Sequence, residues 1–339
     1  MREIFMIIKN LSETFGPSGN ENEIRDFIVE TIKDYVDSLK IDKMGNIVAY
    51  KKGKNKNSKK ILIGAHMDEV GFMIKSIEEN GMLRFLPVGS IDKRILIGKN
   101  LLIGKDKIKG VICYKPIHLQ KKDYNNIPDF DSLFIDIGAV DKKDAEKYVS
   151  VGDYAVFDTK FEKRGNIIKG KSFDDRLGCG ALIEILKDRY ENDVYGCFFV
   201  QEEVGLRGSK VAAYNNPSDY AIVLEGTSAA DMPHSKDEPD FPKMGDGVVI
   251  TISDRSLFVD KDLLKMSVEY AKENKIKYQF KQPMIGGTDG GEIHRSREGV
   301  KTIVFAVPSR YIHSPVSFAD LRDYQSMIDL TKILLNKLK

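Results

Sequence analysis

Apolar residues recur along this chain with two different periods. Ile24, Ile28 and Ile32 lie at helical spacing, together with Phe27 and Tyr35, so the segment is predicted to be an amphipathic helix with one buried face. Two apolar runs then follow, at 47–50 and 61–65, and they are typical of strands on either side of a Lys-rich turn.

The residues ahead of this helix have the spacing of a capping box. Ser18 is followed three positions later by Glu21. We therefore expect the Ser18 hydroxyl to cap the helix and the Glu21 carboxylate to reach back to the backbone.

The alternation of helices and strands returns after residue 170. A helix is predicted over 177–189, and a final amphipathic helix over 318–338. Between them, the near-continuous apolar runs at 194–200, 220–224 and 302–307 predict strands. Strands that are apolar on both faces belong in the middle of a sheet covered by helices.

The segment between these two parts has a different character. It contains short β-rich runs separated by Gly, Asp and Lys turns, with a single helical pattern at 142–149. The runs are 71–77, 83–88, 100–103, 111–114, 133–137 and 154–157. This spacing is typical of a small β-barrel or sandwich. We therefore predict an α/β fold with a mixed central sheet covered by helices, formed by residues 1–70 and 168–339, and a β-barrel-like domain inserted at 71–167.

Composition narrows the function classes. The 339 residues carry 53 Lys and Arg against 51 Asp and Glu, a net charge of +2, so no strong field favours nucleic acid or an acidic membrane surface. No apolar run approaches the roughly 20 residues that cross a bilayer, and the first residues lack a leader pattern. Three cysteines argue against a disulfide framework, and Cys179 is expected to be a buried thiol. We expect a cytoplasmic protein.

Polar residues that bind metals stand just past the ends of the apolar runs. His66 follows the run at 61–65, and Asp68 two positions on could hold the imidazole nitrogen that His66 does not use for a metal. Asp174 and Asp175 begin the helix near 177. An Asp there is commonly an N-cap, but one of the two could cap while the other bridges two cations, with Arg176 offsetting the charge.

Two adjacent carboxylates, Glu202 and Glu203, follow the run at 194–200. Burying them is costly unless a cation compensates. Because neighbouring strand residues point to opposite faces, one could bind metal while the other handles a proton. Gly205 and Gly208 permit a tight turn into a helix that Ser209 is expected to cap. The alternative is an acidic strand end facing water.

Two further runs end the same way. Glu225 follows the run at 220–224, and His313 comes shortly after 302–307. Ligands bind at the carboxyl ends of strands in open α/β sheets, and a His/Asp/Glu set of this kind suits a pair of divalent cations with a spare carboxylate as general base. Of the other histidines, we expect His118 at the surface, and His234 and His294 are weaker pocket candidates.

At this point the motifs resemble one family. H-M-D-E-V-G, S-F-D-D-R-L-G, Q-E-E-V-G-L-R-G-S, L-E-G-T-S-A-A-D, G-G-T-D-G-G and Y-I-H-S-P occur in this order. They are similar to the tetrahedral (TET-type) aminopeptidases, the forty-second metallopeptidase family, whose members include glutamyl and deblocking aminopeptidases and a branch labelled cellulase M. The resemblance covers essentially the whole chain.

The resemblance implies roles for these residues. His66 and Glu225 would bind one metal, Glu203 and His313 the other, and Asp174 would bridge the two. Glu202 would be the general base and Asp68 the support of His66. Many relatives have Asp where Glu225 stands, which leaves the metal assignment intact. Zinc is expected, with cobalt or manganese as alternatives. The family also implies dimers that assemble into a dodecamer through the insertion.

The expected reaction is removal of the N-terminal residue from short peptides. Pocket candidates from the remaining polar motifs are Asp254, Arg255, Thr288, Asp289 and Arg310. A glycosidase is one rival, because paired carboxylates also hydrolyse sugars, but it leaves His66, Asp174 and His313 without roles. A non-catalytic assembly protein is the second rival. The preferred N-terminal residue does not follow from the sequence.

Overall fold

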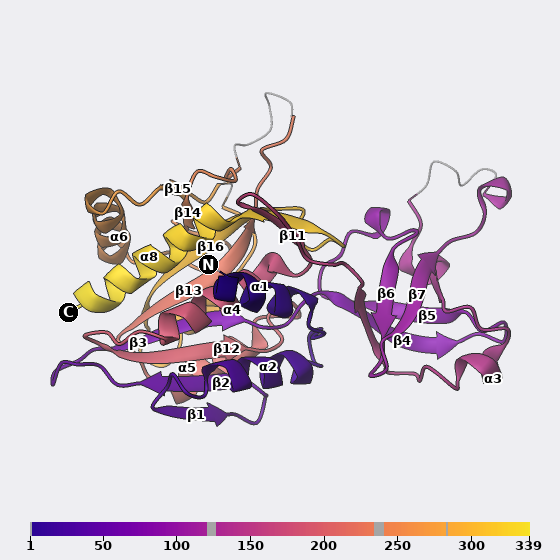
Figure 1. Ribbon diagram of the computed structural model, residues 1–339, viewed down its shortest axis with the longest axis horizontal. Coiled ribbons are helices and arrows are strands. Elements are labelled where there is room, and N and C mark those ends of the chain that lie inside the picture. The colour runs from indigo at the N-terminus through magenta and orange to yellow at the C-terminus, as the bar shows by residue number, and fades with distance from the viewer. Residues whose placement is uncertain (1, 121–126, 234–240, 283) are drawn as a thin grey trace.

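The computed structural model describes residues 2–120, 127–233, 241–282 and 284–339. Its chain forms two bodies that lie side by side, a large helix-covered sheet and a smaller barrel (Figure 1). Both chain ends lie in the larger body. The predicted fold class, a mixed sheet covered by helices with an inserted barrel, is confirmed.

The host sheet has eleven strands among the described residues. They are β1 (Ser38–Ile41), β2 (Ile47–Lys51), β3 (Lys60–His66), β10 (Glu162–Arg164), β11 (Ile167–Gly170), β12 (Asp193–Phe199), β13 (Tyr220–Ser228), β14 (Val248–Ile250), β15 (Tyr278–Phe280), β16 (Lys301–Arg310) and β17 (Ser317–Asp320). The order along the sheet is β1-β2-β12-β3-β13-β16-β17-β11-β10, with β14 joining β16 and β15. The four middle strands, β12, β3, β13 and β16, are parallel. Their carboxyl ends therefore meet at one edge.

Helices cover both faces of this sheet. They are α1 (Arg2–Glu13), α2 (Asn22–Ile32), α4 (Phe173–Leu186), α5 (Arg207–Asn215), α6 (Lys261–Glu273), α7 (Gly290–Ile293) and α8 (Leu321–Lys337). Side chains of β3 alternate between the faces, as strand geometry requires. Ile61 and Ile63 belong to the core that includes residues of α4 and α8, whereas Leu62 packs with Ala212 of α5 on the other side.

The insertion is a closed antiparallel barrel of six strands in the order β4-β5-β8-β7-β6-β9. These are β4 (Gly71–Ile77), β5 (Leu83–Val88), β6 (Asn100–Ile103), β7 (Ile108–Cys113), β8 (Phe134–Asp136) and β9 (Tyr154–Phe157), with a short helix α3 (Lys142–Ala145) before β9. It has its own core, in which Phe72 packs edge-on against Phe85 and Phe157. The chain enters the barrel five residues after His66 and returns to the host sheet before Asp174, so both ends of the insertion lie close to the predicted site.

The structure corrects two local predictions, on Ser18 and Ser209, and extends a third, on Glu21. Ser18 does not cap α2, because its hydroxyl donates to Asp68 instead. Glu21 does accept from a backbone N–H, that of Gly19, but it also accepts from Gln201, so it ties two loops together. Ser209 lies inside α5 rather than at its start, and its hydroxyl donates to the Leu206 carbonyl.

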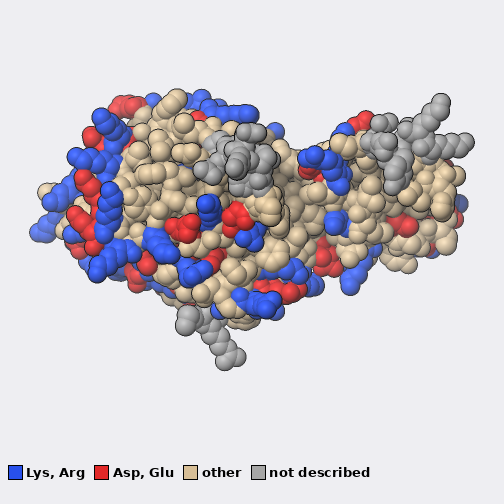
Figure 2. All heavy atoms as spheres, turned by 90° about the horizontal axis from the view of Figure 1, so that it is seen from above, with Lys and Arg blue, Asp and Glu red and all other residues tan. Residues whose placement is uncertain are grey.

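The last predicted helix also begins later than expected. Residues from 317 to 320 form β17, and α8 starts at Leu321 with Asp320 as its cap. The short strands β10, β11, β14 and β15 and the helix α6 were not predicted. Figure 2 shows basic and acidic side chains interspersed over the face seen from above. Among the described residues, no helix has the length and apolar content that crossing a bilayer requires.

Candidate metal centre

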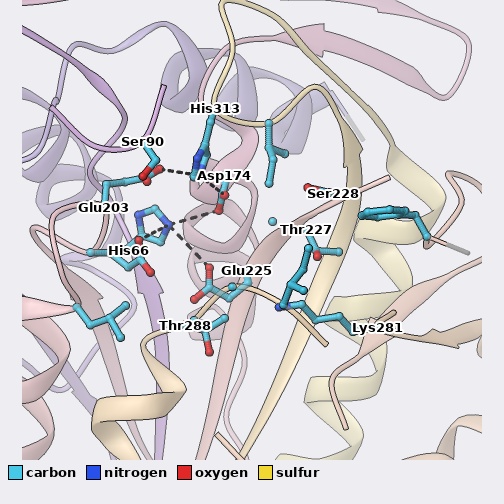
Figure 3. Close-up of a pocket in the computed structure, with 18 of the residues that line it drawn as sticks. His66, Ser90, Asp174, Glu203, Glu225, Thr227, Ser228, Lys281, Thr288 and His313 are labelled. Atoms are coloured by element: carbon cyan, nitrogen blue, oxygen red, sulfur yellow. Dashed lines mark ion pairs between the residues drawn. The ribbon is translucent and has the colours of Figure 1, made fainter. Parts of the chain in front are cut away.

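Four adjacent parallel strands deliver the predicted residues to one place. His66 is the last residue of β3 and Glu225 lies within β13. Glu202 and Glu203 lie in the loop after β12, not on the strand as predicted, and His313 follows β16. Because these strands are neighbours, residues up to 247 positions apart meet above the same edge of the sheet (Figure 3).

Asp174 stands between the two histidines. Its Oδ1 is 3.4 Å from His66 Nε2, and its Oδ2 is 3.3 Å from His313 Nε2. His66 Nε2 is also 3.8 Å from Glu225 and 3.9 Å from Glu202, while His313 Nε2 is 3.4 Å from Glu203. Two of the sets with ligand atoms within 4.8 Å of one another, His66–Asp174–Glu225 and Asp174–Glu203–His313, share Asp174.

Asp175 does the capping that an Asp at this position was expected to do. Its Oδ1 accepts from Gly178 N at 2.9 Å, and its Oδ2 accepts from the backbone N–H of His66 at 3.2 Å. The side chain of Asp174 is thereby left to face the histidines. Arg176 does not offset the charge of Asp174, because its guanidinium binds Glu69 and backbone carbonyls at the end of α1 and in the loop that follows it.

Asp68 contacts three segments that form the site. It is fully buried and accepts from Ser18 Oγ at 2.6 Å, from Glu202 N at 3.0 Å and from Glu203 N at 3.2 Å. Its Oδ1 is also 3.4 Å from His66 Nδ1, a contact longer than an ordinary hydrogen bond. Burial alone would raise the pKa of Asp68, but these donors outweigh it and lower the pKa. One carboxylate thus fixes the Glu202–Glu203 loop and faces the ring of His66.

The site holds more negative charge than its own residues neutralise. Burial raises the pKa of Glu202 and Glu225 well above the ordinary value, and that of Glu203 to about 7. Burial opposes protonation of the histidines, but the facing carboxylates prevail, raising the pKa of His313 to about 9 and that of His66 well above normal. A divalent cation would relieve this repulsion.

Several buried atoms at the site have no hydrogen-bond partner. They include Oε1 of Glu203, Oε1 of Glu225 and Nδ1 of His66. Buried polar atoms are ordinarily paired, so such exceptions call for an explanation. The mixed nitrogen and oxygen donors suit zinc, cobalt or manganese, and the orphaned oxygens lie within the candidate ligand sets. The residues therefore fit a pair of divalent cations.

Strained backbone surrounds the cluster, by which we mean the candidate metal-site residues His66, Asp174, Glu202, Glu203, Glu225 and His313. Five of the eight described non-glycine residues with positive φ lie beside it. They are Ser172, Gln201, Leu206, Tyr311 and His313 itself, at φ between 56° and 62°. This left-handed conformation costs free energy in residues with a Cβ and persists where surrounding contacts enforce it, commonly at functional sites.

A cavity of about 440 Å³ opens over the cluster. Beyond the cluster its lining includes Ser90, Thr227, Lys281, Thr288 and Ile312. Lys281 is the one charged lining residue outside the cluster, and no ion pair joins it to another described residue. Lys281 and Ser90 belong to no motif quoted from the sequence, and Thr227 lies within L-E-G-T-S-A-A-D but was not proposed as a pocket residue.

The predicted substrate residues separate into two groups. Thr288 lines the cavity, and Asp289 is buried beside it with neither carboxylate oxygen hydrogen-bonded. Asp254, Arg255 and Arg310 do not line it. Asp254 holds the loop by accepting from Thr288 Oγ1 and from backbone N–H groups, the Arg255 side chain is exposed, and Arg310 forms a two-point ion pair with Asp231.

The other described histidines and the cysteines contribute no side chain to the candidate ligand sets. His294 is bound to the Gly290 carbonyl, His118 is exposed, and His234 lies outside the described residues. All three cysteines are free, and Cys179 is a buried thiol whose sulfur contacts the His66 carbonyl. Burial raises its pKa well above the usual value, as predicted for an unreactive thiol.

Comparison with known proteins agrees with this geometry. The model of the M42 glutamyl aminopeptidase family matches residues 45–330. The chain belongs to this family. As an M42 protein it is a metallo-aminopeptidase, a hydrolase of peptide bonds. A putative aminopeptidase of Acetivibrio thermocellus is 37% identical over 97% of both chains, and the lysyl aminopeptidase of Pyrococcus furiosus is 34% identical over 98% of this chain and 97% of its own.

Solved structures of M42 relatives share the whole fold. The TET aminopeptidase of Thaumarchaeota archaeon SCGC AB-539-E09 has a TM-score of 0.96 at 35% identity, covering 100% of this chain and 97% of its own. A Thermotoga maritima protein named as an endoglucanase has a TM-score of 0.82 at 38% identity, over 97% and 96%. PhTET1-12s, a dodecamer, has a TM-score of 0.87 at 33% identity, over 98% and 99%.

Proposed function

We propose that this M42 aminopeptidase works with two divalent cations and removes the N-terminal residue from short peptides. The observation that carries the proposal is the position of Asp174, whose two oxygens each face a different histidine. His66 and Glu225 would hold one cation, Glu203 and His313 the other, and Asp174 would bridge them. Zinc suits this donor set best, and cobalt or manganese would also fit.

Bound cations would polarise the scissile carbonyl and lower the pKa of an attacking water. The residues of the chain supply the rest. Glu202 belongs to neither of the two sets that share Asp174, yet its Oε2 lies 3.9 Å from His66 Nε2. It is therefore placed to take the proton of the water and to deliver it to the departing amine. Asp68 positions Glu202 by accepting its backbone N–H.

The barrel at 71–167 would serve assembly and restrict access to the site. Its ends lie at the cluster, and Ser90 of the barrel lines the cavity. The dodecameric relative supports a dodecameric assembly of this chain, which would be built from dimers. The endoglucanase name of another relative does not favour a glycosidase, because sugar hydrolysis gives no task to the two histidines that face Asp174.

The variant Glu202→Gln tests the role of this residue. We expect the rate of aminoacyl-arylamide hydrolysis to fall by about 10²–10⁴-fold, because the amide cannot accept a proton. Metal content should remain at two ions per chain by elemental analysis. Glu298→Gln, at an exposed position, is the matched control and should keep full activity. Undiminished hydrolysis in Glu202→Gln would contradict the assignment, and absence of bound metal in the native protein would favour a non-catalytic assembly protein.

A further inference from the structure

A second cavity, of about 580 Å³, adjoins the cavity over the cluster. Two segments form it, residues 90–99 of the barrel and residues 311–316 between β16 and β17. Ser90, Ile312 and His313 line both cavities. A molecule held at the cluster can therefore extend past His313 into the seam between the two bodies of the protein. In Figure 3, Ser90 and His313 lie on one side of the cluster, while Thr227 and Lys281 lie on the other.

The chemistry of this second cavity differs from that of the first. Its walls are largely apolar, with Ile91 and Ile95 from the barrel and Pro315 and Val316 from the host. Asp92 is paired with Arg94, so its charge is already compensated. Lys99 is exposed and forms no ion pair with the residues that the structure describes. The cavity thus combines an apolar wall with the positive charge of Lys99, which no described residue compensates.

We infer that this cavity binds the part of the peptide that lies beyond the scissile bond, selects an apolar second residue, and binds the C-terminal carboxylate of short peptides through Lys99. The inference rests on the proposed aminopeptidase function and names the substrate class more closely. A volume of 580 Å³ is within the range of cavities that bind small ligands, which are typically apolar with a few polar contacts.

Charge decides which end of the peptide lies in which cavity. The free α-amine is positive, so Lys99 would repel it from the second cavity. The C-terminal carboxylate has the opposite preference. The first cavity has room beside Thr227, Lys281 and Thr288 for the side chain of the N-terminal residue. The residues after the scissile bond would therefore lie in the second, apolar cavity.

This arrangement favours peptides of a few residues. Each extended residue spans about 3.3–3.6 Å, so only a short peptide presents its carboxylate to Lys99 while its first peptide bond lies at the cluster. A longer peptide keeps the apolar contact but loses the ion pair. The exposed position of Lys99 limits its effect to roughly two- to five-fold in kcat/KM, and the apolar wall should discriminate by on the order of ten-fold per well-buried side chain.

The test uses tripeptides that share an N-terminal Leu. The zinc-loaded enzyme is assayed with Leu-Phe-Ala and Leu-Asp-Ala, and with Leu-Phe-Ala as the free acid and as the C-terminal amide. We expect higher kcat/KM for Phe than for Asp at the second position, and for the acid than for the amide. Lys99→Met should remove the acid–amide difference. Lys109→Met, at an exposed barrel lysine that lines neither cavity, should retain it.

Val316→Asp supplies an independent measurement. The added carboxylate should reduce the preference for Phe over Asp at the second position, and its circular dichroism spectrum shows whether the variant is folded. Hydrolysis of all peptides with no dependence on the second residue, or an acid–amide ratio that Lys99→Met leaves unchanged, overturns the inference and leaves the aminopeptidase function standing. Failure of the metal-loaded enzyme to cleave any peptide or arylamide overturns both.

Discussion

Replacing Asp68 with Asn should weaken metal binding through the position of neighbouring groups. Oδ1 of Asp68 faces Glu202 N and His66 Nδ1, while Oδ2 faces Ser18 Oγ and Glu203 N. An amide can present its oxygen to only one of these pairs. If it keeps the Oδ1 side, its NH₂ group can donate to the Ser18 hydroxyl, which also accepts, but it meets the N–H of Glu203.

One buried N–H without a partner costs about 1–3 kcal/mol, and the remaining bonds weaken because the negative charge is lost. We therefore expect the free energy of unfolding of the metal-free protein to fall by about 2–4 kcal/mol. If the amide turns the other way, its NH₂ group donates to Nδ1, and Nε2 becomes protonated and unable to bind metal. Either orientation displaces a ligand, so metal affinity should fall by about 10–100-fold.

The assay is a zinc titration in competition with a chromophoric chelator, paired with denaturant unfolding of the metal-free protein. Asp193→Asn is the matched control. Asp193 also accepts from several donors, Gly53 N, Ser58 Oγ and Tyr50 OH, but lies at the opposite end of β12. That variant should lose stability and keep its zinc affinity. Zinc affinity of Asp68→Asn within two-fold of the native value would refute the reasoning.

Further predictions concern protons and the first side chain of the substrate. In the metal-free protein the pKa of Glu203 is raised to about 7 and that of His313 to about 9, so zinc binding at pH 7 should release protons. The calorimetric enthalpy of zinc binding should then depend on the ionisation enthalpy of the buffer. An enthalpy independent of the buffer would contradict this prediction. Lys281→Glu should lower kcat/KM for Glu-arylamide relative to Lys-arylamide by roughly ten-fold or more, since an ammonium that forms no ion pair with the described residues is replaced by a negative charge. Lys281→Met should fall between, and an unchanged ratio would argue against contact with the first side chain. Burial raises the pKa of Asp323 to about 6, above its unfolded value. The free energy of unfolding of the native protein should therefore fall by up to about 2–3 kcal/mol relative to that of Asp323→Asn as pH rises from 4 to 7, with the loss complete above pH 6. Denaturant midpoints that move in parallel for both proteins would exclude this effect.

The parts of the fold that the sequence predicted are those with strong apolar periodicity. The middle strands are apolar on both faces, and the six barrel strands are separated by clear turn residues, so the prediction that they exist was confirmed. The helix α6 was missed because it buries only Leu263, Ser267 and Ala271, too weak a pattern to recognise. Strands of three residues, such as β14 and β15, form through pairing partners far away in the chain.

At the site, the residue types at the strand ends were enough to predict that six side chains lie close together. What escaped prediction depended on competition between local and distant partners. Ser18 has the spacing of a cap, yet it donates to Asp68, 50 positions away, because a buried carboxylate is the stronger acceptor. Arg176 likewise binds a distant residue, Glu69, rather than its near neighbour Asp174. Lys281 belongs to no motif, and only the folded cavity reveals it.

The shared position of Asp174 also bears on when the enzyme can acquire its metals during synthesis. One ligand set needs β3 and β13, but the set of Asp174, Glu203 and His313 needs the residue after β16, close to the C-terminus. A growing chain on the ribosome therefore lacks this second set until β16 and His313 have been made, and the central sheet cannot be complete earlier. Under the proposed two-cation function, the full pair of cations would bind only after the parallel strands of the central sheet have come together.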